Sequence, residues 1–95
     1  MTYQEANQLK INNLHLLKTV DAKGFTIDEI IIVPTNESSR HEFFKDYLFT
    51  NDPDIALSRF INDDLEVWAI DTRHLRESNV LFYNKIEKPN VSLDK

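Results

Sequence analysis

The apolar residues in the first part of the chain recur near helical spacing. Between residues 3 and 20 they lie among good helix formers and predict a helix, with an apolar face formed by Ala6, Leu9, Leu16, Leu17 and Val20. The end of this segment also alternates, so a strand over residues 14–20, paired in a hairpin across the following turn, is a second interpretation. Gly24 is predicted to have positive φ and to end the helix.

Residues 25–33 are rich in β-branched side chains and stand between Gly24 and Pro34, which is typical of a strand. Its apolar residues fall on both faces, so that Ile30 and Ile32 lie opposite Phe25, Ile27, Ile31 and Val33. Strands that are apolar on both faces are typical of a sheet covered on two sides. We therefore expect this strand to be central.

Two helices are predicted between residues 39 and 61. Ser39 precedes Glu42 by three residues, the spacing of a capping box, and the helix carries an apolar stripe of Phe43, Phe44, Tyr47 and Leu48. Asp52 and Pro53 suit the N-cap and the first position of the second helix. The buried side of that helix is predicted to consist of Ala56, Leu57, Phe60 and Ile61.

Two strands are predicted in the last third of the chain, over residues 65–70 and 80–86. The nine residues between them are too few for a parallel crossover, so we expect the strands to be antiparallel. The order α-β-α-α-β-β predicts a single α+β domain over residues 1–88, with helices packed on a largely antiparallel sheet of about three strands. Residues 89–95 are polar and are expected to fray.

Composition narrows the function classes. The chain has 95 residues and a net charge of −5, which disfavours non-specific binding to nucleic acid or to anionic lipid. It has no cysteine, in keeping with a reducing compartment, no signal-peptide pattern, and no apolar run long enough to cross a membrane. We expect a cytoplasmic protein that binds neither nucleic acid nor a membrane.

The single glycine excludes several kinds of site. Phosphate-binding loops and nucleophile elbows need more than one glycine, because the backbone must approach the ligand or adopt positive φ. The three histidines have no recognised ligand spacing, and the acidic residues Asp63, Asp64, Glu66 and Asp71 lack the spacing of a calcium loop. We expect no cofactor and no metal.

The strongest candidate for ligand chemistry lies between the last two predicted strands. Here two guanidinium groups and an imidazole gather in an acidic protein, in the residues Asp71, Arg73, His74 and Arg76. Arginine binds carboxylates and phosphates through parallel hydrogen bonds, and histidine transfers protons near neutral pH, so a cleft here would take an anionic ligand. The alternative is an ordinary solvated loop whose charges pair locally.

The last two strands also suggest a protein interface. If helices cover only one face of the sheet, the other face is an apolar patch of Trp68, Ile70, Leu81 and Tyr83. Monomers rarely leave such a patch exposed, so another protein or a second copy would cover it. The alternative is that the first helix covers this face within the monomer.

These observations favour a small acidic, non-catalytic interaction or regulatory protein that binds another protein, or itself as a homodimer. The first alternative is a small-ligand-binding protein or enzyme that uses the segment Asp71–Arg76 on an anionic ligand. This reading needs His74, an arginine and a carboxylate to converge in a pocket. The second alternative is an acidic inhibitor of a nucleic-acid enzyme, in which carboxylates imitate phosphates.

Overall fold

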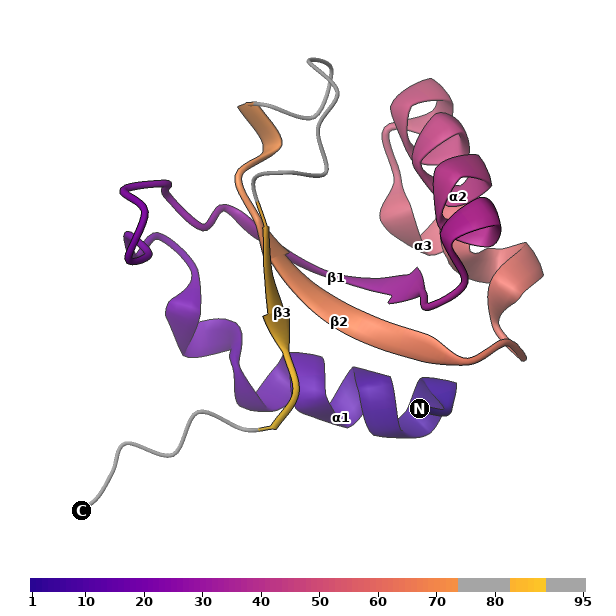
Figure 1. Cartoon of the computed structure of the whole chain (residues 1–95), viewed down its shortest axis with the longest axis horizontal. Coiled ribbons are helices and arrows are strands. Elements are labelled where there is room, and N and C mark those ends of the chain that lie inside the picture. Colours follow the sequence, from indigo (N-terminus) through magenta and orange to yellow (C-terminus); the bar gives the residue numbers. More distant parts are fainter. Residues whose placement is uncertain (74–82, 89–95) are drawn as a thin grey trace.

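The computed structural model describes residues 1–73 and 83–88, in which three α-helices pack on a three-stranded antiparallel sheet. The elements follow in the order α1 (Tyr3–Asn12), β1 (Glu29–Pro34), α2 (Glu37–Thr50), α3 (Pro53–Leu57), β2 (Leu65–Ile70) and β3 (Tyr83–Ile86). Figure 1 shows α1 along one side of the sheet and α2 with α3 on the other. The predicted α+β class is confirmed.

The sheet has the order β1-β2-β3, so β2 is its central strand. Glu29 pairs with Ile70 at one end of the β1–β2 ladder, and Pro34 pairs with Leu65 at the other. All six residues of β2 are buried, and so are the last five of β1. The prediction that β1 is central is wrong, because β1 lies at the edge of the sheet. It is apolar on both faces because helices cover both sides of the sheet.

The predicted first helix is too long. Thr2 caps α1 in a capping box with Glu5, and the helix ends at Asn12. The buried Asn13 donates a hydrogen bond from its side-chain amide to the Leu9 carbonyl at 2.9 Å, which satisfies one of the last helical carbonyls. A 3-10 turn follows, and residues 14–20 form no regular strand; a single antiparallel bridge joins Val20 to Thr26.

Gly24 has a φ of +89°, which confirms the predicted positive φ but not the predicted role at a helix end. It lies instead in a tight turn organised by Asp21, whose Oδ1 accepts hydrogen bonds from the backbone N–H groups of Lys23 and Phe25 at 2.8 and 2.9 Å. The strand predicted to begin at Phe25 begins at Glu29. Before it, Ile27 is buried, and its backbone hydrogen bonds join Lys18 and Thr19 rather than β2.

The capping of α2 differs from the prediction. Asn36 is the N-cap, and its side-chain oxygen accepts from the Ser39 N–H at 3.0 Å, so Ser39 lies inside the helix instead of capping it. Asp52 caps α3 as predicted and accepts from the backbone of Asp54 and Ile55 at 2.9 and 3.3 Å. Ile61, predicted to be buried, is 40% exposed because the chain turns there towards β2.

The second predicted strand matches β2, and its antiparallel pairing with β3 is confirmed. Residues 80–82 of the third predicted strand, and the tail 89–95, lie outside the described residues. Within the described ranges, no helix has the length and apolar character needed to cross a membrane.

Candidate functional site

Two of the four residues predicted to bind an anionic ligand are described. Asp71 is buried, and Arg73 donates to it from Nε at 2.8 Å and again from Nη2, while the Arg73 backbone N–H donates at 3.1 Å. These hydrogen bonds raise the pKa of the Arg73 guanidinium. The arginine is therefore neutralised within its own segment, as the solvated-loop alternative expects. His74 and Arg76 lie outside the described residues.

A cleft of about 480 Å³ adjoins this segment and is lined by Glu29, Tyr47, Leu48, Asn51, Pro53, Thr72 and Arg73. These residues come from the start of β1, the end of α2, the start of α3 and the residues after β2. Thr72 is fixed on the cleft wall, because its backbone N–H and hydroxyl donate to the two carboxylate oxygens of Asp28 at 2.9 and 2.5 Å.

The charges around the cleft are mainly negative. Burial raises the pKa of the Glu29 carboxyl. Burial, and then the nearby carboxylates of Glu29, Asp28 and Asp52, raise the pKa of the Tyr47 phenol to about 12. With Arg73 already paired to Asp71, this environment disfavours the anionic ligand that the sequence suggested.

The predicted apolar sheet face is covered within the chain. Trp68 and Ile70 are 1% and 4% exposed, so the prediction that they form an open patch is wrong. The cover comes from α2 and not from α1: the Phe44 ring lies 5.6 Å from the Trp68 ring, and the Arg40 guanidinium lies over it at 5.1 Å. Tyr83 stacks on Trp68 at 3.6 Å and is half-buried, whereas Leu81 lies outside the described residues.

Trp68 also contacts a buried carboxylate, that of Glu66, which the sequence analysis considered only as part of an acidic group of residues. Glu66 is 8% exposed and accepts a hydrogen bond from Trp68 Nε1 at 3.1 Å. It also pairs with Lys85 at 3.1 Å and Arg40 at 3.7 Å, and raises the pKa of the Lys85 ammonium. Through these partners Glu66 links α2, β2 and β3. Because its carboxylate is already engaged by them, it is not available to bind a ligand.

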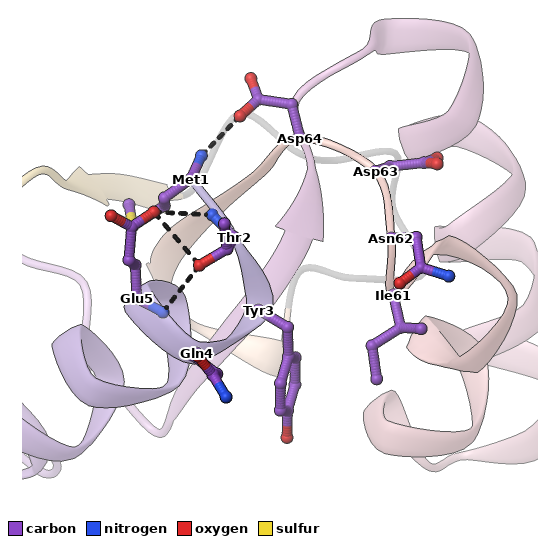
Figure 2. A pocket seen from close by; sticks show the side chains of 9 residues that line it. All are labelled: Met1, Thr2, Tyr3, Gln4, Glu5, Ile61, Asn62, Asp63 and Asp64. Atoms are coloured by element: carbon purple, nitrogen blue, oxygen red, sulfur yellow. Dashed lines mark hydrogen bonds and ion pairs between the residues drawn. The ribbon is translucent and has the colours of Figure 1, made fainter.

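A second hollow lies between the start of α1 and the segment before β2 (Figure 2). The Met1 amino group pairs with Asp64 at 2.5 Å and donates to the Leu65 carbonyl at 2.7 Å. The capping box of Thr2 and Glu5 occupies the other polar groups drawn with dashed lines in Figure 2. The Met1 amino group, Asp64 and Glu5 of this hollow are therefore engaged within the chain.

The outer face of α2 and α3 carries exposed apolar side chains. Phe49, in the last turn of α2, is 91% exposed, and Ile55, in α3, is 57% exposed. Arg59, in the 3-10 turn that follows α3, pairs with Asp46 of α2 at 3.3 Å. Because α2 ends at Thr50 and α3 starts at Pro53, both apolar residues lie near the junction of the two helices.

The same layer is acidic. Between Glu37 and Asp64, seven aspartate and glutamate residues stand against three arginine and lysine residues. This segment therefore carries four of the chain's five net negative charges. Two of these carboxylates, Glu42 and Asp46, lie on α2 and pair with Arg59, whereas Asp64 pairs with the Met1 amino group.

Comparisons with known proteins add no functional assignment. No protein-family model matches the chain, and neither a curated protein nor a solved structure was found to resemble it significantly.

Proposed function

We propose that this chain is a non-catalytic protein-binding domain whose docking face is the outer surface of α2 and α3. The observation that carries this proposal is the 91% exposure of Phe49. Burying a phenylalanine side chain contributes about 1.5–3 kcal/mol, and buried aromatic residues dominate the binding energy of many interfaces. Phe49 lies opposite the buried stripe of α2, so a partner can reach it without any rearrangement of the core.

Ile55 extends the apolar centre of this face, and charged residues surround it. Arg59 forms ion pairs with Glu42 and Asp46 of α2, each at 3.3 Å. Apolar centres with polar rims are the usual anatomy of a protein interface. The docking face is thus defined by Phe49 and Ile55, with Glu42, Asp46 and Arg59 at its rim.

The charge of the face indicates the chemistry of the partner. The segment of residues 37–64, which contains this face, has an excess of four carboxylates, and this charge favours a partner whose apolar pocket is rimmed by lysine or arginine. A second copy of the chain would bring the same negative charge against itself, so this face favours a different protein over a homodimer. In the special case of an acidic inhibitor, the basic rim would belong to the nucleic-acid-binding groove of an enzyme. Duplex DNA would then compete with this chain for the partner.

The test begins by placing a photo-crosslinking phenylalanine analogue at position 49 in living cells, and at position 11 as a control. Ile11 is 50% exposed on α1, on the other side of the sheet, and so serves as a matched apolar position. The proposal expects a cross-linked protein from position 49 that position 11 does not give. The affinity of the purified partner for the wild-type chain and for variants is then measured.

Phe49→Ser is expected to weaken binding to the purified partner at least tenfold, whereas Ile11→Ser leaves the Kd unchanged. Both substitutions remove an exposed apolar side chain, so neither is expected to disturb folding, and circular dichroism checks this. Equal Kd values for Phe49→Ser and the wild-type chain, or equal losses from the two variants, would overturn the proposal.

A further inference from the structure

We propose that the cleft lined by Glu29, Tyr47 and Thr72 is a binding site for an organic cation, an ammonium or guanidinium group held between the Glu29 carboxylate and the Tyr47 hydroxyl. This site is separate from the docking face on α2 and α3 and does not rest on the proposed function. The proposed ligand is a cation, whereas the neighbouring arginine led the sequence analysis to expect an anion.

The first observation is the hydroxyl of Tyr47. The residue is 5% exposed and lines the cleft, and its ring is held by Phe43 at 6.1 Å. Within residues 1–73 and 83–88, no group hydrogen-bonds to this hydroxyl. Buried polar groups nearly always have a partner, so an unpartnered hydroxyl at the wall of a cleft points to a ligand.

The second observation is the carboxylate of Glu29. Its side chain is half-buried, and no described residue donates a hydrogen bond to it or pairs with it. The neighbouring carboxylates are already used: Asp28 accepts two hydrogen bonds from Thr72, and Asp52 caps α3. Glu29 is therefore the carboxylate that remains available to a ligand in the described part of the cleft.

The surrounding charges support a cation. Asp28, Asp52 and Asp54 add negative charge near Glu29 and Tyr47, while Lys10 and Lys18 act on Glu29 in the opposite direction. Arg73, on the cleft wall, is neutralised by Asp71. The C-terminal end of α2 also faces the cleft through Leu48 and Asn51, and its last turn holds no basic residue, so the negative end of that helix is uncompensated.

An organic cation suits the site better than a metal ion. Among the described residues, no group of three histidine, cysteine, aspartate or glutamate side chains is placed to hold a metal. An ammonium or guanidinium group needs only one carboxylate and one or two neutral oxygen acceptors. A cleft of about 480 Å³ has room for a small amine or for the side chain of a lysine or arginine from another protein.

The test is a titration of the full ¹⁵N-labelled chain, followed through the amide signals of Leu48, Asn51 and Thr72. The probes are n-butylammonium chloride and a lysine-containing hexapeptide with blocked ends, with sodium phosphate as the anionic control. Saturable shifts with the cations, and none with phosphate, are expected. Comparable affinities for the two cations would identify a free amine as the ligand, and at least tenfold tighter binding of the peptide would identify a protein side chain.

Three variants make the test specific. Glu29→Gln is expected to weaken binding of the cation at least tenfold and Tyr47→Phe several-fold, because each removes one of the two contacts. Glu37→Gln removes an exposed carboxylate from the first turn of α2, at the other end of that helix, and is expected to leave the affinity unchanged. Shifts with phosphate in place of the ammonium, or unchanged affinity in Glu29→Gln, would overturn the site. Phe49→Ser leaves this titration unaffected, so the two proposals fail independently.

Discussion

Lys18 stands in the left-handed region of backbone conformation, with a φ of 72°, although it is not a glycine. An L-residue pays about 1–2 kcal/mol for this conformation, because its Cβ crowds its own carbonyl oxygen. The surrounding backbone enforces it: the Lys18 N–H donates to the Ile27 carbonyl at 2.7 Å, and the Ile27 N–H donates to the Thr19 carbonyl at 2.9 Å. Replacing Lys18 with glycine should therefore stabilise the protein.

The gain can be worked out from two opposing contributions. Glycine relieves about 1–2 kcal/mol of backbone strain in the folded chain. It also gives the unfolded chain more conformational freedom, which costs about 0.4–1 kcal/mol. The hydrogen bonds to Ile27 and Thr19 involve backbone atoms alone and are kept. The net effect is an increase of about 0.8 kcal/mol in the free energy of unfolding, or a Tm rise of roughly 3–6 °C for a domain of this size.

Urea and thermal unfolding, followed by circular dichroism, measure this gain. Lys18→Ala is the matched control, since it removes the same charge and side chain but keeps the Cβ and therefore the strain. The alanine variant should lie within about 0.5 kcal/mol of the wild-type chain, as for other surface substitutions. If Lys18→Gly is no more stable than Lys18→Ala, the reasoning from backbone strain is refuted.

Three further predictions concern single residues. Gly24→Ala should lower the free energy of unfolding by about 1 kcal/mol or more. The added Cβ meets nothing within 4 Å, so this loss comes from the backbone strain of a φ of +89°. Gly24→Asn should lose less in the same unfolding assay, because asparagine tolerates positive φ better. The raised pKa of Glu29 means that the folded chain holds this proton more tightly than the unfolded chain does. The stability that this group contributes is therefore present at low pH and is lost as the pH rises through the folded pKa. The urea midpoint should accordingly fall less steeply between pH 4 and 7 in Glu29→Gln than in the wild-type chain. Glu66→Ala leaves the buried Trp68 Nε1 without its acceptor and Lys85 with only its 3.8 Å contact to Glu87, and should cost about 2–3 kcal/mol in urea unfolding. A loss below about 0.5 kcal/mol would contradict the role of this carboxylate.

The elements that could be predicted from the sequence are those whose signals are local. Asp52 and Pro53 are adjacent, and the capping geometry they specify is the one the structure contains. The strand over residues 65–70 is bounded by polar residues at both ends and was placed correctly. The end of α1 was missed because helical spacing continues past it, while the residues that follow are fixed by backbone hydrogen bonds to residues 25–27, which no local pattern reveals.

The candidate sites follow the same division. The pairing of Asp71 with Arg73 could be anticipated from their spacing, because it is a contact between near neighbours. The cover over Trp68 could not, since strand alternation indicates which residues share a face but not which helix lies on it. Tyr47 was correctly placed in the apolar stripe of its helix. Its position in a cleft with Glu29 and Thr72 could not be predicted, because these residues are distant in sequence.

The connection between β1 and β2 has a consequence for the order of folding. Pro34 pairs with Leu65, 31 positions later, and Glu29 with Ile70, 41 positions later, so the ladder must close a long loop before any of its bonds form. The intervening α2 and α3 have local caps and contact each other directly, and their formation shortens that loop. Asp52→Ala, at the junction of the two helices, should therefore slow refolding in stopped-flow experiments more than it speeds unfolding. The helical hairpin would then act as the folding nucleus on which the sheet closes.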